Sequence, residues 1–295
     1  MKHILITGVN SYVGNTVERY LTERNAEAGR ELYRVDKVSL RGETLERLEK
    51  TSYDAVLHVA GIAHADVGNV SEETKELYYR VNRDLAVETA RWAKTAEIPQ
   101  FIYLSSVIVY GESTEGGRIT AGTVPAPANF YGDSKLQAEN ELRKLETERF
   151  RVALLRLPMV YGKGSKGNFS MLVKLAGKLP VFPAFENERS MIYAENLAEF
   201  IRILIERGEG GLFFPQNREY VTTAKLVKVV RETEGKKMIL CRALNPFVRI
   251  LCKVPGKIGG LAKKAFGTLA IDRELSGDLA AYQIFSFEES VKKSV

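Results

Sequence analysis

Short apolar runs alternate with segments of helical periodicity along the first two thirds of the chain. Five runs have the length and composition of buried strands: 4–7, 32–38, 54–59, 101–104 and 152–157. Three segments between them place apolar side chains at helical spacing: 13–23, 72–96 and 134–148. Near-continuous apolar strands separated by helices indicate a parallel sheet covered on both faces. We therefore predict an α/β fold with a Rossmann-type, doubly wound parallel sheet.

The pattern changes after residue 182 to short irregular pieces and helices. This predicts a small C-terminal substrate-binding lobe at the carboxyl edge of the sheet, where open α/β sheets bind ligands. We expect a dinucleotide-binding domain at 1–165, to which 190–215 returns. The lobe is then formed by 166–189 and 216–295. Proline and glycine cluster at 111–127 and 162–167, which predicts long loops there.

Composition adds one asymmetry to this picture. Hydrophobic residues make up 45% of the chain and charged residues 27%, as in ordinary soluble proteins. The net charge of +6 resides in residues 236–295, which contain 11 basic and 5 acidic residues. Residues 236–271 contain 8 basic residues and no acidic one. The whole surface is therefore not polybasic, and an electrostatic partner is expected at the C-terminal fifth.

Few residues are available for a disulfide framework or a metal site. The chain has two cysteines, Cys241 and Cys252, and three histidines, His3, His58 and His64. We predict neither a disulfide framework nor a bound metal. The N-terminus lacks the pattern of a signal peptide, and no apolar stretch is long enough to span a membrane. The sequence therefore predicts a cytoplasmic protein.

A glycine-containing loop follows the first strand and begins the first helix. Glycines at such a turn let the backbone approach a pyrophosphate, which the helix N-terminus stabilises. The usual middle glycine is replaced by Ser11, whose Cβ restricts the approach and whose hydroxyl can donate to a phosphate. The candidate cofactor-binding residues of this loop are Gly8, Asn10, Ser11, Tyr12, Val13 and Gly14.

The end of the second strand decides which dinucleotide is bound. An acid there binds the free ribose hydroxyls of NAD(H), and Asp36 is the candidate. A small residue followed by arginine suits the 2′-phosphate of NADP(H), and Ser39 with Arg41 fits this description. Both alternatives stay open, with a slight preference for NADP(H).

A phenol and an amine stand four residues apart at Tyr131 and Lys135, on one face of a predicted helix. The lysine charge favours the phenolate, so such a tyrosine can exchange a proton with an alcohol or ketone. Ser105 and Ser106 come at the end of the fourth apolar run, where catalytic groups of open sheets lie. Strand, serine, tyrosine and lysine in this order are more specific than any one of them.

Taken with further motifs, this order resembles the extended short-chain dehydrogenase/reductases, the NAD-dependent epimerase/dehydratase group that acts on nucleotide sugars. The resemblance runs from Ile4 to about Phe214 and includes TGxxxxxG, His58-Val59-Ala60-Gly61, Val81-Asn82, SSxxVYG, YGxSK and RLPMVYG. It implies that Ser106, Tyr131 and Lys135 are catalytic. It also implies cofactor contacts from Ala60, Gly61, Asn82, Ser105, Tyr131, Lys135 and Pro158.

The same resemblance suggests how a substrate is held. Residues 189–197 match in part a family segment whose arginine contacts the substrate diphosphate, which implies this role for Arg189. Met159 stands where many members have an asparagine that contacts the phosphates, and we expect Asn168 to supply a substitute contact. Ser106 is expected to bind the sugar C4 oxygen as well.

The resemblance implies an NAD(P)-dependent enzyme acting at C4 of a UDP-sugar in polysaccharide synthesis, in a homodimer. A slight preference goes to reduction of a UDP-4-keto-6-deoxy-N-acetylhexosamine. The alternatives are a UDP-hexose 4-epimerase, acting on UDP-glucose or UDP-N-acetylglucosamine, and a non-catalytic dinucleotide-binding scaffold. A nucleic-acid partner is not expected.

Three interpretations of the basic segment 236–271 remain. Its cations lie on solvated helix faces, or contact the substrate diphosphate as a lid, or meet a membrane surface. Pro255 and Gly256 interrupt any long amphipathic helix, which makes the membrane interpretation the least favoured.

Overall fold

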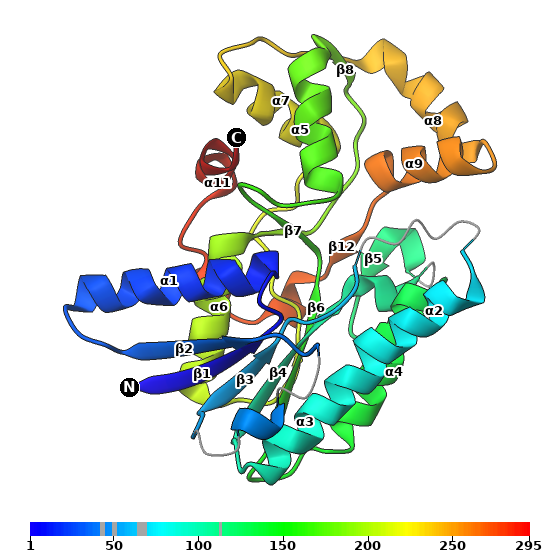
Figure 1. Ribbon diagram of the computed structural model, residues 1–295. Helices are drawn as coiled ribbons and strands as arrows, with labels where there is room; N and C mark the ends of the chain where they lie inside the picture. The colour runs from blue at the N-terminus through cyan, green and yellow to red at the C-terminus, as the bar shows by residue number, and fades with distance from the viewer. Residues whose placement is uncertain (42–44, 49–51, 64–69, 112–113) are drawn as a thin grey trace. The chain divides into compact units, whose positions relative to one another are not determined.

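A computed structural model describes residues 1–41, 45–48, 52–63, 70–111 and 114–295 (Figure 1). Its main sheet has six strands in the order β10-β6-β4-β3-β1-β2, and every neighbouring pair is parallel. The strands are β1 (Lys2–Thr7), β2 (Tyr33–Val38), β3 (Ala55–His58), β4 (Gln100–Ser106), β6 (Arg151–Leu157) and β10 (Gly211–Phe213). The predicted parallel α/β fold is confirmed.

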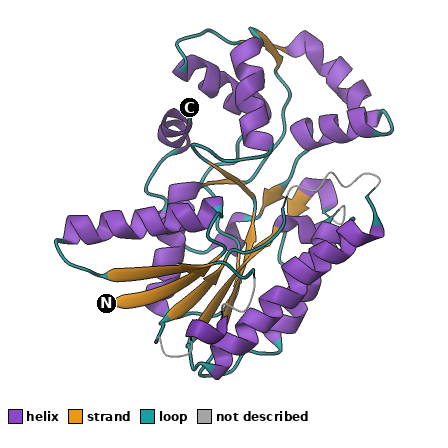
Figure 2. Cartoon of the chain, viewed as in Figure 1, coloured by secondary structure: helices purple, strands orange, loops and turns teal. Residues whose placement is uncertain are grey.

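Helices cover both faces of this sheet (Figures 1 and 2). They are α1 (Tyr12–Ala28), α2 (Glu72–Tyr79), α3 (Leu85–Thr95), α4 (Phe130–Arg143) and α6 (Ala194–Arg207). Helices α3 and α4 pack on one face, where Ala90 and Leu142 join a buried cluster with Val56, Phe101 and Leu154 of the strands. Helices α1 and α6 lie on the other side in Figure 1.

The strand order reverses direction between β1 and β3. From β1 the chain passes outward to β2, and from β3 it passes through β4 and β6 in the other direction. The carboxyl ends of the strands at such a switch point form the ligand-binding crevice of open α/β sheets. Gly8 follows β1 and Ala60 follows β3, so the predicted cofactor residues lie at this point.

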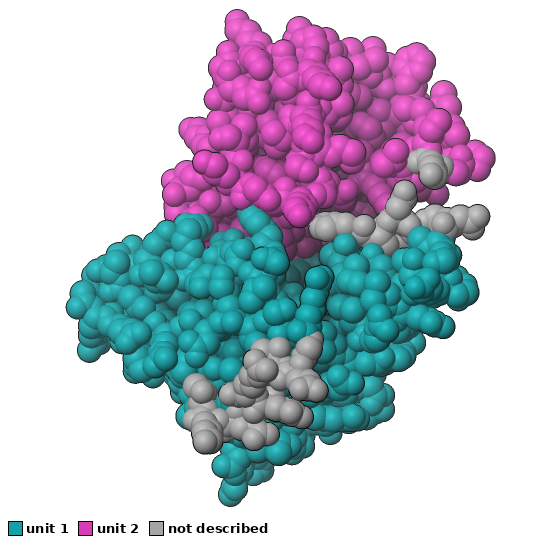
Figure 3. Space-filling model, in the orientation of Figure 1, with its two compact units in different colours: residues 1–113, 123–157, 197–215 teal, residues 114–122, 158–196, 216–295 magenta. Residues whose placement is uncertain are grey.

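The chain forms two compact units (Figure 3). The first contains 1–113, 123–157 and 197–215, and the second contains 114–122, 158–196 and 216–295. Three two-stranded pairs of the second unit are β5 (Arg118–Ile119) with β12 (Ala270–Ile271), β7 (Met159–Tyr161) with β9 (Met191–Tyr193), and β8 (Val181–Pro183) with β11 (Ile239–Cys241).

The second unit has its own helices and its own core. Its helices are α5 (Asn168–Lys178), α7 (Thr223–Thr233), α8 (Asn245–Lys253), α9 (Lys257–Phe266), α10 (Leu279–Tyr282) and α11 (Phe287–Ser294). Tyr161, Phe169 and Phe287 are buried together at its centre. The Tyr161 hydroxyl is 2.5 Å from Ser290 Oγ and 2.9 Å from Asn217 Nδ2.

The structure departs from the sequence prediction at three places that shape the fold. Helix α4 begins at Phe130 rather than 134 because Asn129 caps it: its Oδ1 accepts from the Gly132 amide at 3.0 Å. The stretch 72–96 is divided by a π-helical turn, Arg80–Asp84, between α2 and α3. The expected loop at 111–127 contains strand β5, which pairs with β12.

Candidate active site

The loop after β1 has the close backbone approach that a pyrophosphate site needs. Gly8 has φ +100°, and a Cβ there would lie 3.0 Å from Ala60 Cα. A Cβ on Gly14 would lie 3.0 Å from the side chains of both Ile6 and Val59. The backbone conformation of Gly8 favours glycine, and the absence of a side chain at Gly14 lets the start of α1 pack closely against the ends of β1 and β3.

The N-terminus of α1 suits an anion. Ser11 caps the helix, its Oγ accepting from the Gly14 amide at 3.3 Å, and no acidic residue lies in the first turn. Asn10 and Ser11 precede the helix, and Tyr12 and Val13 begin it. The positive end of the helix dipole at this turn suits the pyrophosphate of a dinucleotide.

The two alternative contacts to the cofactor ribose, Asp36 and Ser39 with Arg41, have different surroundings. Asp36 lies within β2, opposite Leu5, and its carboxylate accepts from the Tyr53 hydroxyl at 3.1 Å and pairs with His3 Nε2 at 2.9 Å. Ser39 and Arg41 follow the end of β2, where the Arg41 amide donates to Ser39 Oγ at 3.4 Å. The Arg41 side chain is exposed.

Ser106 and Tyr131 come together at the carboxyl end of β4. Ser106 has extended backbone and begins a 3₁₀ turn, Val107–Tyr110, with its Oγ accepting from the Ile108 amide at 3.3 Å. Burial raises the pKa of Tyr131 to about 12, while a hydrogen bond with Ser106 acts in the opposite direction. Tyr131 is therefore a neutral phenol near pH 7, able to donate its proton.

Lys135 is buried one turn along α4 from Tyr131. Its Nζ donates to the Leu104 carbonyl at 2.9 Å and lies 4.6 Å from the centre of the Tyr103 ring. Burial lowers the pKa of Lys135 to about 8, and the charge of Glu139 works against this change. The amine is thus held at the end of β4 and titrates close to working pH.

Gly132 allows α4 to approach this strand end. A Cβ there would lie 2.8 Å from the Ile108 carbonyl oxygen and 3.0 Å from Pro127 Cβ. Since Ile108 belongs to the turn that follows Ser106, this contact sets how near Tyr131 comes to Ser106.

Asn82 connects the loop after β3 to α4. Its Oδ1 accepts from the Ile62 amide at 2.8 Å, and its Nδ2 donates to Ser134 Oγ at 3.1 Å. A Cβ on Gly61 would lie 3.1 Å from that Oδ1 and 3.3 Å from Lys135 Nζ. The π-helical turn that carries Asn82 thus brings Ala60 and Gly61 beside the lysine, and such turns are frequent at functional sites.

The sequence interpretation missed a buried polar network under the catalytic helix. Glu139, one turn beyond Lys135, is fully buried and pairs with Arg156, whose Nη2 lies 2.6 Å from Glu139 Oε2. Ser105 donates to the same carboxylate, and Arg156 donates to the Tyr110 hydroxyl at 2.7 Å. Of the two adjacent serines, Ser105 thus contacts the ion pair and Ser106 contacts Tyr131. An arginine inside the apolar run 152–157 was the available signal.

His58 joins two strands under the site. Its Nδ1 is 3.0 Å from Thr7 Oγ1, and burial, followed by the charge of Lys135, lowers its pKa to about 3. Its Nε2 is buried without a hydrogen-bond partner in the described part of the chain. His58 is therefore neutral and packs against the Tyr103 ring, with centroids 6.0 Å apart.

Of the predicted substrate residues, Asn168 and Arg189 belong to the second unit, as does Pro158, whereas Ser106 belongs to the first. Asn168 is exposed in the first turn of α5, after Gly167 with φ +92°. Arg189 Nη1 donates to the carbonyls of Lys264 and Gly267 at 2.8 and 2.9 Å, so its guanidinium also holds the end of α9.

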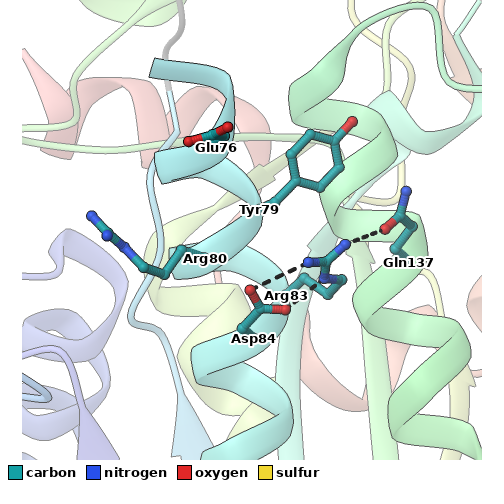
Figure 4. Close-up of a pocket in the computed structure, with 6 residues that line it drawn as sticks. All are labelled: Glu76, Tyr79, Arg80, Arg83, Asp84 and Gln137. Atoms are coloured by element: carbon teal, nitrogen blue, oxygen red, sulfur yellow. Dashed lines mark hydrogen bonds and ion pairs between the residues drawn. The ribbon is translucent and has the colours of Figure 1, made fainter. Parts of the chain in front are cut away.

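A surface pocket of about 470 Å³ lies elsewhere on the first unit, between α2 and α4 (Figure 4). Arg83 crosses it, donating to Gln137 at 2.7 Å and pairing with Asp84 at 2.6 Å. Gln137 is two residues from Lys135, on the opposite side of the helix. The pocket is thus separate from the face of α4 that carries Tyr131 and Lys135.

No group of three or more metal-ligating side chains occurs among the described residues, and His64 lies outside them. The glycine-containing loop after β1, the capped start of α1 and the residues Ser106, Tyr131 and Lys135 fit a dinucleotide-binding site of the Rossmann type.

Comparison with known proteins identifies the family. Residues 4–213 match the model of the NAD dependent epimerase/dehydratase family, and the chain belongs to this family. It is therefore an NAD(P)-dependent enzyme of the nucleotide-sugar epimerase and reductase type, which confirms the resemblance seen in the sequence.

Named relatives include both reaction types. A UDP-glucose 4-epimerase of Vibrio cholerae is 30% identical over 77% of this chain and 74% of its own. A probable low-salt glycan biosynthesis reductase of Haloferax volcanii is 28% identical over 79% of this chain and 80% of its own. The fold is also that of a dTDP-4-dehydrorhamnose reductase of Bacillus anthracis solved with NADP, with TM-score 0.72, 17% identity and coverage of 100% and 99% of the two chains.

Proposed function

We propose that the protein reduces the C4 ketone of a UDP-4-keto-6-deoxy-N-acetylhexosamine in the synthesis of a surface polysaccharide. When bound, the nicotinamide supplies the hydride. Ser106 donates a hydrogen bond to the C4 oxygen, Tyr131 gives it a proton, and Lys135 holds the cofactor ribose and stabilises the resulting phenolate. Asn168 and Arg189 are proposed to contact the substrate diphosphate.

The observation that carries this proposal is the protonated Tyr131 beside Ser106. A reduction that produces an alcohol needs an acid at the C4 oxygen, and a phenol with a pKa of about 12 is in the acid form. An epimerase first needs a base at the same position, since it begins by oxidising the sugar. The protonated phenol is the form that reduction requires, and we take reduction as the first candidate.

NADP(H) is the proposed cofactor. The carboxylate of Asp36 is already used by His3 and Tyr53, whereas Ser39 and exposed Arg41 stand just beyond the end of β2. We expect Arg41→Ala to lower kcat/KM for NADPH about tenfold or more, the scale of a hydrogen bond to a charged group. The same substitution should change kcat/KM for NADH only slightly. Equal losses with both cofactors would contradict this assignment.

The second candidate is a UDP-hexose 4-epimerase, favoured by the name of the Vibrio cholerae relative. Mass spectrometry separates the two. UDP-4-keto-6-deoxy-N-acetylglucosamine with NADPH should gain two hydrogens. UDP-glucose or UDP-N-acetylglucosamine without added cofactor should be unchanged. An isobaric product from either of these sugars, with no reduction of the ketone, would establish the epimerase instead. The absence of reaction with all of these sugars would contradict both candidates.

A further inference from the structure

Helices α8 and α9 form a hairpin with large apolar side chains in solvent. The exposed fractions are 64% for Phe247, 62% for Ile250 and 41% for Leu251 on α8, and 62% for Ile258 and 55% for Leu261 on α9. In each helix these residues are spaced by three or four positions and so share one side. Large apolar residues grouped this way on a surface mark an interaction site.

Cations accompany the apolar side chains. Arg249 and Lys253 on α8, and Lys263 and Lys264 on α9, are all exposed. None of the four forms an ion pair with another described residue, and the sequence from 236 to 271 contains no acid. The hairpin therefore combines exposed apolar side chains with uncompensated positive charge.

The α8–α9 hairpin is closely packed and anchored to the rest of the second unit. A Cβ on Gly259 would lie 1.7 Å from the Val254 carbonyl oxygen, so the two helices meet as closely as backbones allow. Val248 and Ala262 are buried on the inner side. The Thr223 hydroxyl donates to the Ala265 carbonyl at 2.5 Å, which ties the end of α9 to α7. The exposed apolar side is thus the outer side of a well-anchored pair of helices.

Pro255 and Gly256 have a different effect from the one expected from the sequence. They interrupt a long helix, but the chain turns there, with Gly256 at φ +82°, and begins a second amphipathic helix. Neither helix exceeds ten residues, and no helix in the described ranges is long and apolar enough to cross a bilayer. The geometry suits attachment to a surface.

We propose that the α8–α9 hairpin docks this enzyme on the surface of an anionic membrane. The apolar side chains enter the boundary between headgroups and acyl chains, and the lysines and arginines contact lipid phosphates. Charge decides between this partner and a second copy of the chain, because two hairpins meeting each other would bring two segments without any acidic residue together. The inference does not depend on which sugar the enzyme uses.

Sedimentation with vesicles tests the proposal on the full-length protein. The protein should sediment with phosphatidylglycerol/phosphatidylcholine vesicles, be released by salt, and not sediment with phosphatidylcholine alone. Phe247→Glu/Ile250→Glu should abolish sedimentation. The matched control is Val124→Glu, which alters a side chain 73% exposed outside the hairpin and should bind as the native protein does.

The charge contribution has its own control. Lys263→Gln/Lys264→Gln should weaken vesicle binding about fivefold for each cation neutralised. The same change at Lys292 and Lys293, exposed on α11, should have little effect. An equal loss in both pairs would show a non-specific response to net charge and overturn the assignment to the hairpin.

Fluorescence gives a readout that does not rely on loss of binding. In Phe247→Trp the new indole should shift to shorter wavelength with anionic vesicles and be quenched by brominated lipids. The native protein is the control for this signal, because its one tryptophan, Trp92, packs against the core of the first unit and its emission should not change with vesicles. The proposal is overturned if the native protein does not bind anionic vesicles, or if the emission of the Phe247→Trp variant is unchanged on binding. It is also overturned if Phe247→Glu/Ile250→Glu alters only the oligomeric state in light scattering.

Discussion

Glu139 and Arg156 form a buried ion pair that joins α4 to β6, with Arg156 Nη2 2.6 Å from Glu139 Oε2. Side-chain exposures of 0% and 6% leave solvent little part in balancing either charge. The pair connects α4, which carries Tyr131 and Lys135, to β6, and Ser105 joins it from β4. One network thus fixes the helix relative to two strands of the sheet.

Breaking this pair should destabilise the protein strongly. Glu139→Gln leaves the Arg156 guanidinium buried without its counter-charge, a change that costs about 3–5 kcal/mol in the free energy of unfolding. Urea denaturation followed by circular dichroism measures it. The control Glu141→Gln removes a surface pair with Lys144 and should cost at most about 1 kcal/mol. Similar losses in both variants would contradict the role given to the buried network.

Lys135 should set an alkaline limit to reductase activity. Its pKa is lowered to about 8, so the ammonium is present below that pH and is lost as the pH rises through it. We expect kcat/KM to fall about tenfold per pH unit above this value. Because the charge of Glu139 raises the lysine pKa, Glu139→Gln should move the limit to lower pH. A flat rate between pH 7 and 10 would count against this role of Lys135.

Gly132 should be intolerant of a side chain. Its Cβ would lie 2.8 Å from the Ile108 carbonyl oxygen, so Gly132→Ala must move α4 away from the turn after Ser106. We expect kcat to fall at least about tenfold, since small displacements of a reacting group are costly. The control is Gly116→Ala, where nothing lies within 4 Å of the added Cβ, although its φ of +59° adds backbone strain. Native kcat in Gly132→Ala would refute the close-approach argument.

The fold was predictable because burial dominates the composition of the strands. Run 152–157 is apolar except for Arg156, as expected where both faces of the sheet are covered, so its pattern locates β6. The start of α4 was missed because Gly132 and Asp133 are poor helix formers, and the cap of Asn129 outweighs their propensity.

Motifs in the sequence nominate the candidate site residues, whereas the contacts that tertiary packing makes around them leave no motif. Ser106, Tyr131 and Lys135 follow from spacing and order, and the structure places Ser106 and Tyr131 in contact. Glu139 looks in sequence like a solvated helix residue, because its partner Arg156 comes from a distant strand. The contact between the Arg189 guanidinium and the end of α9 was likewise not predictable, because Arg189 and Lys264 are far apart in the sequence.

The most direct test of the proposed mechanism is the turnover of Tyr131→Phe with UDP-4-keto-6-deoxy-N-acetylglucosamine and NADPH. The matched control is Tyr79→Phe at the end of α2. The Tyr79 hydroxyl donates to Asp133 on the pocket side of α4, away from the face that carries Tyr131 and Lys135. We predict that Tyr131→Phe binds NADPH with native affinity in calorimetry and loses about two or more decades in kcat, while Tyr79→Phe keeps native kcat. Native turnover in Tyr131→Phe would contradict the assignment of this phenol as the proton donor.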